Sequence, residues 1–162
     1  KKRMIEQTLV LIKPDGVKRG LIGEVTKRFE LRGLKIVGIK MVRVDPDFSK
    51  KHYAAHIDKK FYLGLEKFII SGPIVAMIIE GIDAVEVVRK IVGSTEPKGA
   101  DVGTIRGDYA HTSYGHADEQ GKAIENLIHA SGNSDEAKQE VALWFSIDEL
   151  HSYKLSHEEH TL

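Results

Sequence analysis

Cysteine is absent from the 162-residue chain. Disulfides, thiolate zinc sites and thiol nucleophiles are therefore excluded, and the composition fits the cytoplasm, where we expect the protein. No apolar run approaches the ~20 residues that a membrane-spanning helix needs. The first ten residues, KKRMIEQTLV, contain no separate apolar segment followed by a cleavage site. We therefore expect neither a membrane partner nor secretion.

An excess of charge of either sign is also lacking, because 24 lysine and arginine residues balance 24 aspartate and glutamate residues. Proteins that bind nucleic acid or anionic membranes usually depend on a net positive field. The balance predicts no nucleic-acid partner, so any anion must be held by a local cluster of cations. Long linkers, repeats and low-complexity segments are missing as well, and we expect one domain spanning residues 1–162.

Short apolar runs alternate with stripes of helical spacing along the chain. The patterns predict strands at 8–13, 34–43, 74–79 and 126–129, and helices at 17–33, 61–69, after Asp83 and at 134–143. In the second strand, Val37, Ile39 and Met41 are expected on one face, because side chains alternate along a strand. Asp83 and Glu86 have the spacing of a capping box ahead of their helix.

This order of elements favours the α+β class. Helices on one face of a four-stranded, mostly antiparallel sheet, in the split βαβ arrangement, fit it best, with additional helices and a long loop. A doubly wound parallel sheet is less consistent, because the second and third strands flank a helical insertion that is not an obvious crossover. The segment 93–121 is rich in glycine and polar residues, lacks periodicity, and is expected to be either functional or mobile.

Among the eight histidines, His129 has an unusual context. It ends an apolar run in NLIHASG and is followed by residues too small to cover its ring. A neutral imidazole becomes a nucleophile when its other nitrogen donates to an acceptor. Glu140 on the next helix is a candidate acceptor; an exposed position paired with Lys138 or Lys122 is the alternative. A structural or surface role for the histidine also stays open.

His52 and His56 stand four residues apart on an expected helix, a spacing that can place two imidazoles on one metal ion. No third ligand is evident in the sequence. We therefore predict no protein-bound metal site.

Three cationic residues stand apart from ordinary surface charge. Lys13 ends a buried strand before Pro-Asp-Gly, Arg89 follows Val88 on the capped helix, and Arg106 lies within GTIRGD. Arginine suits phosphate because its planar fork binds two oxygens at once. Each residue alone is typical of a structural or surface position, but their grouping around one loop favours an anion site. Thr95 and Asn126 can add neutral hydrogen bonds.

Several motifs follow one another between residues 7 and 150: TLVLIKPDGV, HY with FYLGL, SGPIVAMIIEG, GTIRGD, and NLIHAS with EVALWF. In this combination the chain resembles the nucleoside diphosphate kinase family. The resemblance implies a ferredoxin-like βαββαβ sandwich and a ping-pong reaction. A nucleoside triphosphate gives its terminal phosphoryl group to His129, and a nucleoside diphosphate takes it away.

The resemblance also implies residue roles. Contacts with phosphates or ribose are implied for Lys13, Tyr53, Arg89, Thr95, Arg106 and Asn126. Glu140 and Ser131 are expected to orient or assist the histidine. Phe61 and Leu65 are expected to stack on the base. Stacking contacts the flat face of a base and not its hydrogen-bonding edges, so the protein is expected to accept different bases. Mg²⁺ is expected to arrive with the nucleotide, bridging its phosphates. A homohexamer is the usual assembly in the family, and a tetramer is the alternative.

The chain departs from the family pattern in three places. An extended segment between Arg106 and Asn126 resembles the archaeal form, Gly132 stands where aspartate is usual, and the tail HSYKLSHEEHTL differs from the usual ending. The small apolar residue that usually lies opposite the base platform is not assigned.

Two other functions are compatible with the same fold. An RNA-binding domain is expected to show a basic face with aromatic residues on its central strands. The predicted strands carry Val, Ile and Leu instead. A regulatory relative without catalysis is expected to have lost Lys13, Arg89, Arg106 or His129, and all four are present.

Overall fold

A computed structural model describes residues 4–162. The strands are β1 (Ile5–Ile12), β2 (Lys35–Val42), β3 (Ile74–Ile82) and β4 (Ile128–Ala130). The helices are α1 (Pro14–Lys18), α2 (Ile22–Leu31), α3 (Pro46–His52), α4 (Tyr62–Ile69), α5 (Ala84–Val92), α6 (Ile105–Tyr109), α7 (Tyr114–Glu119) and α8 (Ser134–Trp144). Three 3₁₀ turns lie at Pro97–Gly99, Ile147–Glu149 and Glu158–His160. Within the described range, every helix is too short or too polar to span a bilayer.

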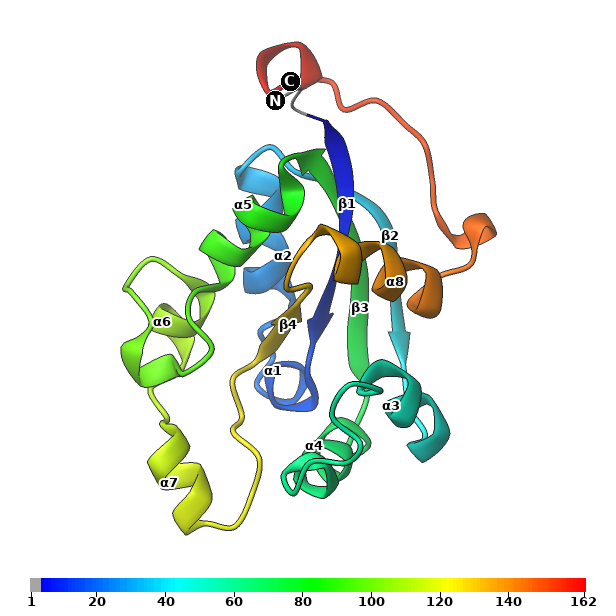
Figure 1. Cartoon of the computed structure of the whole chain (residues 1–162). Helices are drawn as coiled ribbons and strands as arrows, with labels where there is room; N and C mark the ends of the chain where they lie inside the picture. Colours follow the sequence, from blue (N-terminus) through cyan, green and yellow to red (C-terminus); the bar gives the residue numbers. More distant parts are fainter. Residues whose placement is uncertain (1–3) are drawn as a thin grey trace.

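The four strands form one antiparallel sheet in the order β2-β3-β1-β4 (Figure 1). With α2 between the first two strands and α5 between the last two, the chain follows the βαββαβ order. The ferredoxin-like α+β prediction is confirmed. β3 is apolar along nearly its whole length and β1 is apolar from Leu9 onward, which is the pattern of strands buried on two faces.

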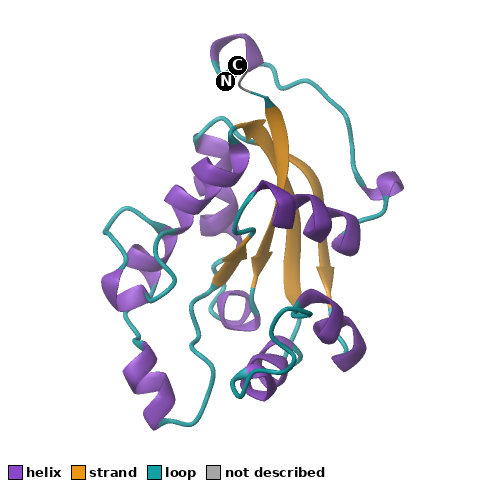
Figure 2. Ribbon diagram, in the orientation of Figure 1, coloured by secondary structure: helices purple, strands orange, loops and turns teal. Residues whose placement is uncertain are grey.

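Helices cover both faces of this sheet (Figure 2). Val10 and Ile12 of β1 point into a core built with α2 and α5. Leu9 and Leu11 point the other way, into a second core that includes Trp144 at the end of α8. The expectation of helices on one face is therefore incomplete. Because side chains alternate along β1 and all four are apolar, each face has to be covered.

A β-bulge changes the faces of β2. Its register against β3 shifts between Ile36 and Gly38, which leaves Val37 as an extra residue. Val37 consequently packs into the second core. Ile39 and Met41 lie on the opposite face, where Ile39 is 54% exposed and Met41 is 58% exposed. The prediction that these three share a face is wrong, because an inserted residue reverses the alternation.

The helix predicted from residue 17 is two helices. α1 ends at Lys18, and Gly20 adopts a φ of 69° before α2 begins at Ile22. This left-handed conformation suits glycine and interrupts a helix. The apolar residues keep helical spacing across the break because both helices pack on the same core.

The cap of α5 also differs from the prediction. Asp83 has a φ of 51°, and its side chain makes no capping hydrogen bond. The backbone N–H of Val85 instead donates to Oε1 of Glu6, 3.0 Å away on β1. The cap therefore comes from a residue distant in the sequence, and a local capping motif does not detect it.

The segment 93–121 contains the short helices α6 and α7. Arg28 of α2 anchors this segment, because Nη2 lies 2.6 Å from Asp108 and Nη1 donates to the Gly103 carbonyl. Thr104 caps α6 by accepting from the backbone N–H of Gly107. The sequence showed no periodicity here because helices of five and six residues are too short to produce it.

The C-terminal tail runs along the first half of β2. The backbone N–H of His151 donates to the carbonyl of Val37, 2.8 Å away, and Nζ of Lys35 donates to the carbonyl of Tyr153. Lys35 also pairs with Glu158. The tail thus covers part of the sheet edge and leaves the second half of β2 open.

Candidate functional site

His129 lies in β4, the short edge strand that pairs with the end of β1. Its side chain is 24% exposed, with buried Ala130 and Ser131 following it. The backbone N–H of Gly132 donates to Oε2 of Glu136 on α8, 3.0 Å away. A Cβ atom at Gly132 would crowd that same oxygen, so a larger residue here would require the flexible Glu136 side chain to move.

Glu140 reaches the histidine from α8. Its oxygens lie 3.0 and 3.2 Å from Nε2 of His129, and Oγ of Ser131 donates to Oε1 at 2.6 Å. Burial acts to raise the pKa of Glu140, but the hydrogen bonds from His129 and Ser131 outweigh it and hold the pKa below its usual value. The ionised carboxylate therefore accepts from Nε2–H, and the lone pair of the neutral ring is on Nδ1.

His52 belongs to the same cluster, although the sequence did not indicate it. α3 ends at His52, so His56 lies beyond the helix, and the expected helical His52–His56 pair is not formed. The ring of His52 instead packs edge-on against His129, with ring centroids 4.9 Å apart. Burial lowers the pKa of His52 to about 3, with His129 adding to the effect, so the ring is neutral. Its Nδ1 accepts from Nε1–H of Trp144 at 3.1 Å, which places its proton on Nε2.

The donor atoms do not form a cage for a hard cation. Across residues 4–162, the one group of three His, Asp or Glu side chains with ligand atoms within 4.8 Å of one another is His52, His129 and Glu140. Two imidazoles with one carboxylate suit a transition metal, whereas Mg²⁺ prefers oxygen ligands. In His52 neither ring nitrogen is free to bind a metal ion, because Nδ1 accepts from Trp144 and Nε2 carries the proton. These residues are therefore a poor match for Mg²⁺.

A pocket of about 150 Å³ lies beside His129. Its lining contains three cationic side chains and no carboxylate; it consists of Lys13, Arg89, Val92, Gly93, Thr95, Arg106, Asn126, His129 and Ala130. Nζ of Lys13 donates to Oδ1 of Asn126 at 2.8 Å, and Nδ2 of Asn126 donates to the carbonyl of Thr95 at 2.9 Å. Burial lowers the pKa of Lys13 to about 8, with Arg106 adding to the effect. Buried neighbouring cations of this kind are stabilised by an anion.

Arg106 is also part of the scaffold. Nε donates to the carbonyl of Asn126, Nη1 to that of Gly93 and Nη2 to that of Ile128, at 3.1, 3.1 and 2.6 Å. The guanidinium thus ties β4 to the end of α5, and one N–H on each terminal nitrogen stays available. Burial lowers the pKa of Arg106 to about 10, with Arg89 contributing, so it is still charged at neutral pH.

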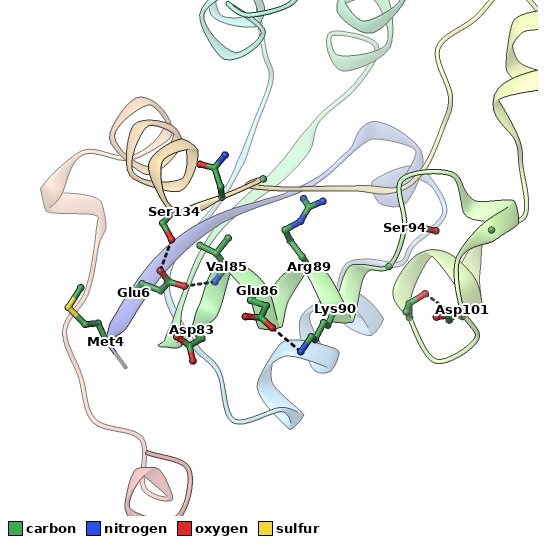
Figure 3. A pocket seen from close by; sticks show the side chains of 15 residues that line it. Met4, Glu6, Asp83, Val85, Glu86, Arg89, Lys90, Ser94, Asp101 and Ser134 are labelled. Carbon is green, nitrogen blue, oxygen red and sulfur yellow. Dashed lines mark hydrogen bonds and ion pairs between the residues drawn. The ribbon is translucent and has the colours of Figure 1, made fainter. Parts of the chain in front are cut away.

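A larger cleft of about 1050 Å³ adjoins α5 and the start of α8 (Figure 3). Its charged lining residues are Glu6, Asp83, Glu86, Asp101, Arg89 and Lys90. Figure 3 shows Lys90 turned toward Glu86, with which it forms an ion pair at 3.0 Å. Because acids outnumber bases here, the cleft is less suited to phosphate than the smaller pocket, although Arg89 lines both.

The remaining predicted residues lie on and between α3 and α4, outside the cationic pocket. Tyr53 follows α3 with its ring centroid 4.7 Å from that of His52, and burial raises its pKa to about 12. Phe61 immediately precedes α4 and is 55% exposed, while Leu65 is half-buried one turn later. An exposed aromatic ring at this place offers a flat apolar face to a ligand.

Comparisons with known proteins agree with this geometry. A family profile described as nucleoside diphosphate kinase matches residues 6–150. A nucleoside diphosphate kinase of Pyrococcus abyssi is 49% identical over 148 residues, which cover 91% of this chain and 89% of that protein. A transition-state mimic of the Borrelia burgdorferi enzyme with bound vanadate and ADP superposes with a TM-score of 0.92 at 43% identity, covering 96% of each chain. A halophilic enzyme from Halobacterium salinarum in complex with CDP gives 0.87 at 44% identity, covering 98% of this chain and 99% of that one. The chain therefore belongs to the nucleoside diphosphate kinase family, phosphotransferases that move the terminal phosphoryl group of a nucleoside triphosphate to a nucleoside diphosphate in a ping-pong sequence.

Proposed function

We propose that Nδ1 of His129 carries the phosphoryl group between the two half-reactions. Its lone pair attacks the terminal phosphorus of a nucleoside triphosphate, the bond from that phosphorus to the bridging oxygen breaks, and a nucleoside diphosphate leaves. A second nucleoside diphosphate then attacks the phosphohistidine with a terminal oxygen and restores the free ring. The negative charge of Glu140, 3.0 Å from Nε2, stabilises the positive charge that the ring gains on attack.

The observation that carries this proposal is the lining of one small pocket. Lys13, Arg89 and Arg106 surround the space beside His129, with no carboxylate among the lining residues. Phosphoryl transfer depends mainly on alignment and on neutralising charge on the phosphate oxygens. In this proposal the three cations supply that charge, and Thr95 and Asn126 align the phosphates or ribose through hydrogen bonds.

The remaining side chains act around this centre. Ser131 holds Glu140 through a 2.6 Å hydrogen bond, and the protonated hydroxyl of Tyr53 donates to a phosphate oxygen. Phe61 and Leu65 support the base through stacking and apolar contact. Because these side chains offer no base-specific hydrogen bonds, purine and pyrimidine nucleotides are both expected as substrates.

Mg²⁺ is proposed to enter with the nucleotide. The three-residue His and Glu cluster is a poor match for a hard cation, whereas phosphate oxygens are good ligands for it. When bound, the ion supplies further neutralisation of phosphate charge. A check is binding of ADP in the presence and absence of EDTA, with Mg²⁺ alone expected to show no measurable binding to the protein.

The assembly is proposed to be a homohexamer. Support comes from β2, whose second half has an open edge and exposes Ile39 and Met41 side by side on one face. An uncovered apolar edge strand is a site for pairing with another chain. Light scattering is expected to give the mass of six chains, with four chains as the contrary result. Met41→Glu is expected to reduce the assembly, while Ile147→Glu, at an isolated exposed position, leaves it intact.

We place the enzyme in the cytoplasm and treat residues 1–162 as a single domain. The absence of cysteine is compatible with that compartment. The tail contacts along β2 support its inclusion in the domain. Cell fractionation tests the first statement, and a single cooperative unfolding transition tests the second.

The decisive experiment is labelling with ATP that carries a radioactive terminal phosphate. A phosphohistidine is labile to acid and stable to base, so the label should show this pattern. His129→Ala is expected to abolish labelling, and His116→Ala, at an exposed position on α7, is the matched control. Persistence of the label in His129→Ala would show that another residue carries the phosphoryl group.

A further inference from the structure

The residue two positions before His129 has a strained backbone. Leu127 has a φ of 72°, and the N–H of Ile128 donates to the carbonyl of Asn126 at 2.8 Å. A three-residue turn with these features is the rare γ-turn with positive φ, which is unfavourable for a residue with a side chain. The Leu127 side chain is buried in the core, so the turn is held where it would not form by itself.

The segment Lys13 to Gly16 holds this turn from the other side. The N–H of Leu127 donates to Oδ2 of Asp15 at 2.9 Å, and the N–H of Lys13 donates to the carbonyl of Leu127 at 2.8 Å. A Cβ atom on Gly16 would lie 3.1 Å from that carbonyl oxygen. Both backbone groups of the strained residue are therefore fixed by one short segment of the chain.

The position of Asp15 is itself unfavourable. Its Oδ1 is buried and has no hydrogen-bond partner within the described residues. Burial raises the pKa of this carboxyl group, partly offset by the bond from Leu127. Few buried polar atoms in proteins lack a partner, and those that do call for an explanation. The other oxygen, Oδ2, is the one that accepts from the Leu127 N–H in the adjacent turn.

Two residues of the pocket lie in or next to this turn. Asn126 is its first residue and bridges Lys13 to the Thr95 carbonyl, while His129 directly follows its last residue, Ile128, in β4. We propose that Asp15 is a positioning residue: its Oδ2 holds the Leu127 turn, and the turn aims Asn126 and His129 into the cationic pocket. This inference rests on the proposed role of His129 as phosphoryl carrier.

The test compares geometry with charge at position 15. Asp15→Asn keeps an oxygen for the Leu127 N–H without the charge, and Asp15→Ala removes the acceptor. The measurement is the single-turnover rate of histidine labelling by ATP. We expect Asp15→Asn to stay within about threefold of the wild type and Asp15→Ala to fall roughly 10- to 100-fold, because small misplacements of reacting groups have effects of that size. Equal slowing in both variants would overturn the proposal, because charge would then be the cause.

A second-site change separates positioning from general stability. Glycine has no steric penalty at positive φ, so Asp15→Ala combined with Leu127→Gly should recover labelling at least fivefold over Asp15→Ala. The same change should lower Tm further, because it removes a buried leucine. Loss of rate and Tm together, without recovery, would mean that Asp15 has only a structural role.

Two more variants keep the test informative. If Asp15→Ala does not fold, Asp15→Glu keeps the charge but moves the carboxylate away from Leu127, and it should label much more slowly than Asp15→Asn. Wild type and His129→Ala are run in parallel. An unlabelled wild type would overturn the role of His129, whereas a labelled wild type with an equally fast Asp15→Ala would overturn the role of Asp15 alone.

Discussion

The carboxylate of Glu140 lies 3.0 Å from Nε2 of His129, and the two residues are only eleven positions apart. The turn between β4 and α8 returns the chain so that Glu140, the seventh residue of α8, faces the strand end. One ring nitrogen is thereby occupied, and the other is left for chemistry.

Glu140→Gln is expected to slow phosphorylation of the enzyme by about 10²-fold, because a neutral amide does not stabilise the positive ring that forms on attack. Affinity for ADP should change by less than about threefold, since Glu140 contacts the histidine and not the pocket. Quench-flow labelling and calorimetric titration with ADP measure the two effects. Asp135→Asn, exposed on the first turn of α8, is the control and should label normally. Equal rates for Glu140→Gln and wild type would place Glu140 among purely structural residues.

Nucleotide affinity should fall at alkaline pH. Burial, aided by Arg106, lowers the pKa of Lys13 to about 8, so above that pH the free enzyme must take up a proton to bind phosphate. The dissociation constant of ADP is therefore expected to rise by about tenfold per pH unit above pH 8. Titration calorimetry between pH 7 and 10 measures it. In Lys13→Met the affinity should be weak and nearly independent of pH over this range, and a flat profile in the wild type would contradict the prediction.

The same group should act on stability with the opposite sign. Between about pH 8 and the ordinary lysine pKa of 10.5, Lys13 is protonated in the unfolded chain and neutral in the folded one. The unfolded state then binds more protons, so the contribution of Lys13 to the free energy of unfolding rises with pH across this window. Urea unfolding of wild type and Lys13→Met at pH 7.5 and 9.5 isolates that contribution. A difference between the two proteins that does not change with pH would contradict it.

Arg89 and Arg106 should differ in stability although both line the cationic pocket. Arg106→Met leaves three carbonyls without their donor, two of them in buried contacts, and is expected to lower the free energy of unfolding by about 3 kcal/mol. Arg89→Met changes an exposed side chain and should stay within about 0.5 kcal/mol of the wild type. Both should weaken ADP binding. Equal stability of the two variants would show that the carbonyl contacts of Arg106 contribute little.

Glu6 should stabilise the start of α5. Its Oε1 accepts from the N–H of Val85 and its Oε2 from Oγ of Ser134, so one carboxylate joins the starts of α5 and α8. Glu6→Ala is expected to cost about 1–2 kcal/mol in urea unfolding, the usual range for loss of an N-terminal cap. Glu86→Ala, which removes only an exposed pair with Lys90, is the control and should cost about 0.5 kcal/mol or less. A smaller effect of Glu6→Ala than of Glu86→Ala would exclude the capping role.

Local patterns were sufficient where an element is long and its surroundings are uniform. The apolar run at 74–79 and the helical stripe at 134–143 correspond to β3 and α8 within a few residues. The motifs around Lys13, Arg106 and His129 predicted a common site, and the structure brings these three residues to one pocket.

Tertiary structure decided what depends on partners far away in the chain. The bulge at Val37 follows from pairing with β3, and the cap of α5 comes from Glu6 on β1. His52 meets His129 because α3 and β4 come together in space, although they are far apart in the sequence. In the sequence, Asp15 has the pattern of an ordinary turn residue, and its contact with Leu127 is evident only in the folded sheet. The sequence by itself determined which elements form and which chemical groups are available, because propensity and periodicity act over a few residues. Only the packed sheet decided which groups face one another, because those contacts join segments that no local pattern connects.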